Sequence, residues 1–147
     1  MKHPLDIVPI LWVFLGLFCL RVLGQILVAF FDVSFLPPME RWHSGLLAYP
    51  YLLTSQILII GLMMRINVDF TRGHGLFVRS HPWFGQGVLY FGYAYLAVMI
   101  VRYLVTMWLY PDQRWFGGSI PIVFHWMLAS YVILFGQYHR HRLHGRA

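Results

Sequence analysis

The sequence predicts an all-α integral membrane protein built as a bundle of four transmembrane helices, and three observations support this fold class. Of the 147 residues, 59% are hydrophobic and only 11% are charged, whereas a soluble domain normally carries about a quarter charged residues. The apolar residues form four runs, each close to the roughly 20 residues that a helix needs to cross a bilayer. Apolar and polar residues do not alternate along these runs, which excludes the strands of a membrane barrel.

The four spans are predicted over residues 7–31, 47–65, 86–110 and 119–138, and together they make residues 1–147 a single membrane domain. The first run is expected to be a retained helix rather than a signal peptide, because it continues past Arg21 and no small-residue cleavage pattern follows it.

The distribution of basic residues predicts the orientation, because cytoplasmic loops are rich in lysine and arginine. These residues concentrate in the N-terminal stub, the second loop and the C-terminal tail. Both termini are therefore expected on the cytoplasmic side, which is the inner membrane in a bacterium. The basic residues lie at membrane boundaries rather than on one extended face, so nucleic acid is not an expected partner. The cations on the predicted cytoplasmic side are Lys2, Arg65, Arg72, Arg79, Arg140, Arg142 and Arg146.

The first outer loop, residues 32–47, is expected to be partly embedded in the membrane interface. Pro37 and Pro38 favour an extended start. Leu36, Met39 and Trp42 make the loop too apolar to lie free in water.

Two arginines interrupt the predicted spans near their midpoints, and no Asp or Glu occurs inside any of these spans. Arg21 lies about 16 Å below Asp32, and Arg102 lies about 15 Å below Asp112, at the helical rise of ~1.5 Å per residue. Because the first and third spans run in the same direction, both guanidinium groups are expected at a similar depth. A charge at this depth is costly, usually faces the interior of a bundle and often marks a site of function.

Polar residues of the other spans fall at the same depth. Gln25 follows the first arginine by one helical turn on the same face. Tyr95 precedes the second arginine by two turns. Gln56, Ser130 and His125 lie near the middle of the second and fourth spans. All four helices are thus expected to contribute to one polar layer.

Two cations inside a bilayer need an anion or a strong set of acceptors beside them. An acid of the first outer loop, Glu40 or Asp32, is one possible source. The other sources are a bound anionic headgroup and the carboxylate of a partner subunit. The alternative is purely structural: the amides hold neighbouring helices together, and the arginines extend along their aliphatic stems toward the interface.

The leading functional interpretation is a non-catalytic subunit or binding module. It holds an anionic lipid headgroup, a quinone-like headgroup or a partner's carboxylate in the polar layer. Membrane lipids and a membrane protein, or a second copy of the chain, are the expected partners. No phosphate-binding loop, nucleophile elbow or paired-carboxylate motif is present, so enzymatic activity is disfavoured. The candidate ligand-binding residues are Arg21, Gln25, Gln56, Arg102, His125, Glu40 and His43.

The alternative interpretation is a redox or enzymatic protein that uses His125 as a haem ligand or proton carrier. A haem with two histidine ligands needs imidazoles that face each other, and His43 is the candidate for the second. Arg21 and Arg102 would then suit the anionic propionates. No other cofactor and no metal site are expected, because Cys19 is the only cysteine and the histidines lack zinc-ligand spacing.

A short stretch at the start of the third span resembles a motif of membrane methyltransferases. Residues 79–85 read RSHPWFG, and the isoprenylcysteine and phospholipid N-methyltransferases carry R-H-P-x-Y-x-G. The resemblance implies S-adenosylmethionine binding at the cytoplasmic face. The stretch has an extra residue between Arg79 and His81, its glycine comes one position early, and the acidic pair of those enzymes is missing. We interpret it as an interfacial helix start, with Pro82 in the first turn and Trp83 at the headgroups.

Overall fold

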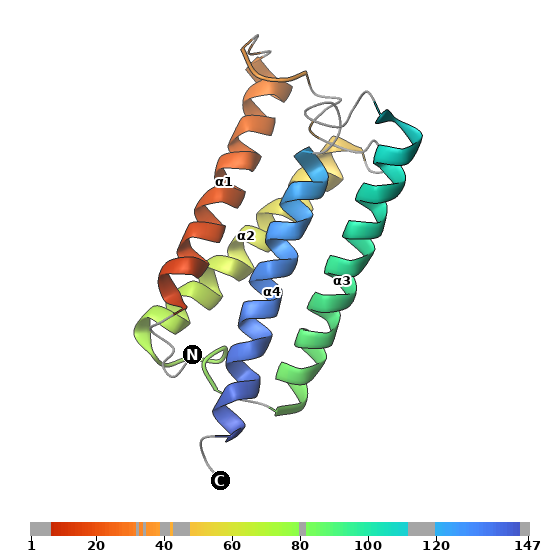
Figure 1. The fold of residues 1–147 in the computed structure, drawn as a ribbon. Coiled ribbons are helices and arrows are strands. Elements are labelled where there is room, and N and C mark those ends of the chain that lie inside the picture. The colour runs from red at the N-terminus through yellow and green to blue at the C-terminus, as the bar shows by residue number, and fades with distance from the viewer. Residues whose placement is uncertain are drawn as a thin grey trace.

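The computed structural model describes residues 7–31, 33, 35–38, 42, 48–79, 82–111 and 120–144. Four helices make up most of this part of the chain, as Figure 1 shows. The prediction of an all-α fold with four helices is confirmed. The start of the first helix and the end of the fourth lie at the same end of the bundle, called the lower end below. The helices are α1 (Val8–Phe31), α2 (Tyr49–Arg72), α3 (Pro82–Leu109) and α4 (Ile120–His144).

Three of the described helices, α1, α2 and α3, are long and apolar enough to cross a membrane. Helix α3 exposes large apolar side chains, which a bilayer would surround. At its two ends Trp83 is 91% exposed and Trp108 is 80% exposed. Tryptophan favours the two boundaries of a bilayer, where its ring is amphipathic. Helix composition thus indicates membrane association.

Helix α2 is longer than the sequence pattern predicted. The second span was predicted to end at residue 65, but the helix continues to Arg72. No proline or glycine interrupts this extension, and Gly73 ends it with a left-handed φ of 71° while its N–H bonds to the carbonyl of Phe70. The gap predicted between the second and third spans is therefore helical over residues 66–72, and this part of the helix contains the buried acid Asp69.

Helix α3 begins four residues earlier than predicted, at Pro82. A proline is favoured in the first turn because its missing N–H has no helical partner there. The expected role of this residue as a helix start is confirmed.

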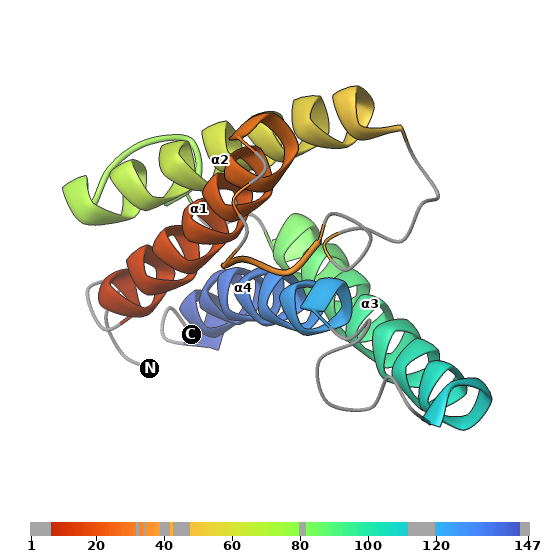
Figure 2. The same ribbon diagram turned by 90° about the horizontal axis from the view of Figure 1, so that it is seen from above.

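The helices form two pairs, α1 with α2 and α3 with α4, and α1 contacts α4 between them. Figure 2 shows α2 lying apart from α3. Helices α3 and α4 pack most closely, because two glycines at their contact carry no side chain. A Cβ on Gly136 would lie 2.9 Å from the main chain of Leu89, and a Cβ on Gly92 would lie 2.8 Å from Ile133. Small residues allow such close approach between membrane helices.

The core lies between α1, α2 and α4 and is mainly aromatic at the lower end. Phe70 of α2 is fully buried, and its ring lies 4.6 Å from that of Tyr138 and 5.8 Å from that of Phe135. Ring pairs at these separations contribute attraction beyond their buried area. The lower end of α2 is thereby attached to α4.

One described residue of the first outer loop, Trp42, packs into the bundle. Its indole lies against Gly24 of α1, where a Cβ would approach the ring to 2.7 Å. The indole N–H donates a 2.8 Å hydrogen bond to the carbonyl of Pro37. Glu40 and most of the rest of this loop lie outside the described residues, so the expected embedding of the whole loop stays a prediction.

Candidate functional site

A chain of hydrogen bonds joins α1, α2 and the first outer loop in the upper half of the bundle. The side-chain amide of Gln56 donates to Gln25 at 2.7 Å. The amide of Gln25 donates in turn to the main-chain carbonyl of Trp42 at 2.9 Å. Arg21 donates to the same carbonyl at 3.1 Å through Nη2. One carbonyl thus accepts from two side chains that lie one turn apart on α1.

The sequence explains why Trp42 reaches this position. Gly24 lies three residues after Arg21, on the same side of α1, and its missing side chain makes room for the indole. A carbonyl of non-helical backbone has free acceptor capacity, which a carbonyl inside a helix has largely used. The loop therefore supplies an acceptor for both Arg21 and Gln25.

Arg21 is buried, with 8% of its surface exposed. Its guanidinium carbon lies 5.1 Å from the centroid of the Phe124 ring on α4, a cation–π geometry. The Nε atom is buried and has no hydrogen-bond partner among the described residues. The neutral groups around Arg21 therefore offset only part of the free-energy cost of burying its charge.

A second polar contact joins α3 and α4 next to this cluster. The hydroxyl of Tyr95 forms a short hydrogen bond with Nδ1 of His125, and the two rings meet edge to face. The charges of Arg21 and Arg102 both act on the Tyr95–His125 pair. Helices α3 and α4 thus each bring a polar side chain near the buried guanidinium of α1.

We call these residues the mid-bundle cluster: Arg21, Gln25, Gln56, Tyr95, Arg102 and His125, together with the carbonyl of Trp42. The structure brings together four of the residues that the sequence singled out, Arg21, Gln25, Gln56 and His125, and the charge of Arg102 acts on Tyr95 and His125. Glu40 and His43 lie outside the described residues. Ser130, which was expected in the same layer, bonds to the carbonyl of Trp126 in its own helix.

Sequence reasoning missed one contributor, the main-chain carbonyl of Trp42. A main-chain group carries no residue-type signal, and the glycine at position 24 was the only local sign of a close approach. Tyr95 was placed on the correct face of its helix, but its contact with His125 required the relative position of α3 and α4.

Two buried atoms of the cluster have no hydrogen-bond partner in the described part of the chain. They are Nε of Arg21, a donor, and Oε1 of Gln56, an acceptor. Buried polar atoms are normally paired. The cluster therefore has room for one further hydrogen-bond acceptor at Nε of Arg21 and one further donor at Oε1 of Gln56.

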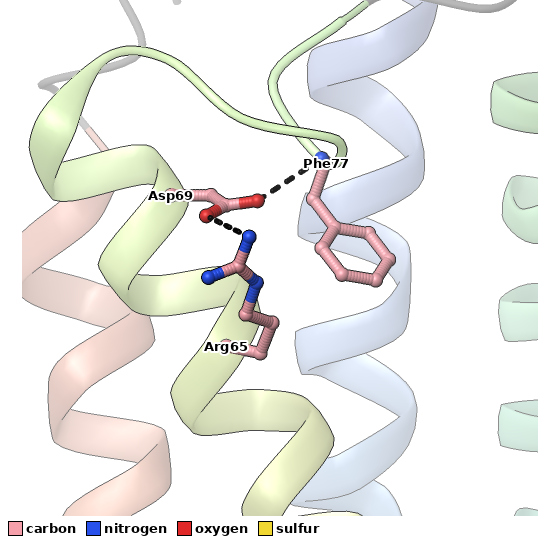
Figure 3. A network of polar contacts seen from close by, with 3 residues as sticks. All are labelled: Arg65, Asp69 and Phe77. Atoms are coloured by element: carbon pink, nitrogen blue, oxygen red, sulfur yellow. Dashed lines mark hydrogen bonds and ion pairs between the residues drawn. The ribbon is translucent and has the colours of Figure 1, made fainter.

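The described residues contain no carboxylate paired with Arg21 or Arg102. The ion pair found among them lies at the lower end of the bundle, where Arg65 approaches Asp69 to 3.4 Å. Asp69 also accepts a 3.3 Å hydrogen bond from the N–H of Phe77, as Figure 3 shows. This acid fastens the segment after α2 to the helix and does not serve the mid-bundle cations.

A separate polar contact holds three helices together near the lower end. Asn67 of α2 donates a 3.0 Å hydrogen bond to the carbonyl of Leu11 in α1. Its side-chain oxygen accepts a 2.8 Å hydrogen bond from the hydroxyl of Tyr131 in α4. Its hydrogen-bonding groups are used within the bundle, so we assign this contact to structure rather than to ligand binding.

No cluster of three metal-ligating side chains occurs within residues 7–31, 48–79, 82–111 and 120–144 or the few described loop positions. A haem bound between His125 and His43 stays a prediction, because His43 is not among the described residues.

Comparison with known proteins finds no matching family model, no matching curated sequence and no matching solved structure. The functional argument therefore depends on the geometry of the cluster and on the composition of the chain.

Proposed function

We propose that the protein is a non-catalytic, membrane-embedded binding module or subunit, oriented with both termini in the cytoplasm. Its mid-bundle cluster holds one acidic group, either the headgroup of an anionic or quinone-like lipid or a carboxylate of a partner's transmembrane helix. The single observation that carries this proposal is the burial of Arg21 beside neutral groups only, in the described part of the chain.

Charge supports an acidic ligand. Arg21 and Arg102 contribute two positive charges around one histidine and one tyrosine. The loss of hydration opposes this arrangement in a hydrocarbon environment. An anion near them offsets this cost. The free donor of the cluster, Nε of Arg21, then finds an acceptor.

Access supports entry from the side of α3. Arg102 is only half-buried, whereas Arg21 lies deep behind α4. The neighbours of Arg102 on α3, such as Val101 and Val105, are exposed apolar residues, which suits contact with lipid or with another membrane helix. The acidic group would therefore meet Arg102 first.

The redox alternative keeps His125 as a haem ligand. The contact between Tyr95 and Nδ1 of His125 leaves Nε2 as the nitrogen for iron, and this arrangement needs a second axial ligand such as His43. A visible spectrum of the purified protein separates the two functions. A Soret band that shifts on dithionite reduction and disappears in His125→Ala would replace the binding-module proposal.

The direct test is Arg102→Gln, compared with Arg72→Gln as the control. Both residues are arginines of long helices, but Arg72 is exposed in the last turn of α2 and lies outside the cluster. The proteins are purified in mild detergent, and retained lipids and proteins are identified by native mass spectrometry. We expect Arg102→Gln to lose one acidic lipid or one stoichiometric partner that the wild type and the control retain. Retention that is equal in all three proteins would reject the proposal.

A further inference from the structure

An apolar cavity of about 390 Å³ lies directly below the mid-bundle cluster. It lies between α2 and the α3–α4 pair, and α2 is set apart from α3 (Figure 2). Aliphatic and aromatic side chains form nearly all of its walls, so they offer almost no polar surface. The cavity extends from Tyr95 near the middle of α3 down to Phe84 near the start of that helix, and to Phe77 in the segment before it.

The upper end of this cavity adjoins the mid-bundle cluster on three helices. On α2, Ile59 lines the cavity and Gln56 lies one turn above it. On α4, Leu128 lines the cavity and His125 lies one turn above it. Tyr95 belongs to both, because it lines the cavity and its hydroxyl bonds to His125. The polar groups of the cluster therefore lie within one helical turn of the upper end of the cavity.

The cavity is open to the surroundings of the bundle on the side between α2 and α3. Leu62 of α2 and Phe84 and Phe91 of α3 line the cavity, and all three side chains are exposed. The opposite wall is buried and includes Met63 of α2 and Tyr131 of α4. A hydrocarbon chain can therefore enter from the side without passing through the polar cluster.

We infer that the ligand of the mid-bundle cluster is a long-chain fatty acid, with its carboxylate at the cluster and its single hydrocarbon chain in the apolar cavity. This inference rests on the proposed function and selects one ligand from the acidic groups named there. Arg21 lies close enough to the upper end of the cavity for its charge to act on Tyr95. Its buried Nε, which has no partner in the described part of the chain, binds the carboxylate, and Arg102 adds a second positive charge. Apolar walls with a few polar groups that fix orientation are typical of small-molecule sites.

The size of the cavity fits one hydrocarbon chain. Phe84 and Tyr95 lie 11 residues apart on α3, so the cavity is about 16 Å long at a rise of ~1.5 Å per residue. That length matches roughly a dozen carbon atoms, since each advances a chain by somewhat less than one ~1.5 Å carbon–carbon bond. The volume agrees, because 390 Å³ holds roughly a dozen groups of the size of a water molecule at about 30 Å³ each. The cavity therefore has no room for the two chains of a phospholipid.

The chemistry of the carboxyl group also suits a site between helices. A carboxyl group can take up a proton and enter hydrocarbon as a neutral group, whereas a phosphodiester stays ionised and its transfer costs far more. At the cluster, the positive charges of Arg21 and Arg102 favour the ionised carboxylate. A partner's transmembrane helix, about 10 Å across with its side chains, is too wide to occupy the cavity.

The experiment is photo-crosslinking of the full chain in phosphatidylcholine nanodiscs, with a fatty acid that carries a diazirine near the middle of its chain. Mass spectrometry identifies the labelled residues. We expect labels on residues that line the cavity, such as Leu62 and Phe91, and competition by unlabelled oleate. Oleyl alcohol has the same chain without the charge and should compete far less. Labels elsewhere on the bundle, or equal competition by the acid and the alcohol, would overturn the inference.

Arg102→Gln tests the contact with the carboxylate. Labelling should fall about fivefold for the loss of one cation. The control is Arg72→Gln, because Arg72 is an exposed arginine that belongs neither to the cluster nor to the lining of the cavity. It should be labelled like the wild type, and an equal loss of labelling in the two variants would contradict the assigned position of the carboxylate.

A second pair of variants tests the position of the hydrocarbon chain. Val88→Trp fills the cavity and should abolish labelling. Val13→Trp is the control, because Val13 lies at a similar distance from the start of α1, is exposed and does not line the cavity. Circular dichroism checks that each variant is folded, and Leu62→Trp, at the exposed rim of the cavity, takes the place of Val88→Trp if that variant unfolds.

The same variants, carried through the native mass spectrometry described above, separate this inference from the proposed function. Loss of a retained acidic ligand in Arg102→Gln, with full retention in Val88→Trp, would support the proposed function and overturn the fatty-acid site. Loss of a fatty acid in both variants, with retention in both controls, would support the two together. Full retention in both variants would overturn both.

Discussion

The side-chain amide of Gln25 donates a 2.9 Å hydrogen bond to the main-chain carbonyl of Trp42, 17 residues away in the chain. The contact is buried and is shared with Arg21. It ties an irregular loop to α1, and through Gln56 it extends to α2. Irregular backbone at such a depth is tolerated where protein satisfies its polar groups.

Replacement of this amide tests how much the shared carbonyl contributes to stability. Gln25→Leu removes the bonds to Trp42 and Gln56 and leaves a buried donor on Gln56 without its partner. Hydrogen bonds between membrane helices contribute about 0.6 kcal/mol each on average, so we expect a loss of about 1 kcal/mol. Thermal unfolding in detergent, followed by circular dichroism, measures the change.

The matched control is Ser130→Ala, because Ser130 bonds only to the carbonyl of Trp126 in its own helix. Its effect should be smaller than that of Gln25→Leu. An equal loss of stability in the two variants would contradict the assigned importance of the interhelical bonds.

Gly136→Ala should weaken the α3–α4 contact. The new methyl group would lie 2.9 Å from main-chain atoms of Leu89, which cannot move as a flexible side chain can. Overpacking of this kind costs about 1–3 kcal/mol. The melting temperature in detergent should fall, and a cysteine cross-link placed across α3 and α4 should form more slowly.

Gly87 supplies the comparison for that variant. It lies in α3, and no atom approaches a Cβ at this position within 4 Å. Gly87→Ala should therefore be neutral or slightly stabilising, since alanine favours a helix by up to about 1 kcal/mol over glycine. If both alanine variants melted at the same temperature, the close packing at Gly136 would not contribute to the stability of the bundle.

Gly75→Ala should release the segment after α2. Gly75 has a φ of 135°, which side chains rarely adopt, and its Cβ would overlap the carboxyl group of Asp69. Limited trypsin digestion should then cut after Arg72 and Arg79 faster than in the wild type. Gly73→Ala shares the positive φ but has open space around its Cβ, so its cleavage should increase less. Reversal of this order would argue against the role of Asp69 in holding the loop.

The orientation is testable with single cysteines. In a Cys19→Ala background, His74→Cys introduces a thiol in the exposed segment between α2 and α3. A membrane-impermeant maleimide should label it in inverted vesicles and not in intact cells, because the orientation that we propose from the distribution of positive charge has this end in the cytoplasm. Labelling in intact cells would reverse the topology.

The helices could be predicted from the sequence because hydrocarbon sets a minimum length for each apolar run. The ends could not be predicted as well. Hydropathy falls after Met64, yet α2 continues because Asn67 and Phe70 pack against α1 and α4 rather than facing lipid or water. Hydropathy measures only the transfer of a residue into lipid. It therefore does not detect helical residues that are polar or aromatic and lie buried inside a bundle.

The mid-bundle cluster was predicted in its residue types and only partly in its contacts. The depth of Arg21 and Arg102 follows from helix rise, and the side of each helix follows from its periodicity. The acceptor of Arg21 is a loop carbonyl, and the partner of His125 is a tyrosine on another helix. Such pairings depend on helix position and tilt, which one sequence does not encode in any local pattern.

Asn67 bonds to α1 on one side and to α4 on the other, so three helices share one fixed point near the lower end. Any rocking of α2 then has its pivot there, and displacement grows with distance along the helix. The opposite end of α2 would move most; it lies at the end of the bundle where the indole of Trp42 packs beside Gly24. Any such movement would have to break the hydrogen bond between Gln56 and Gln25, which joins α2 to α1 in the upper half of the bundle.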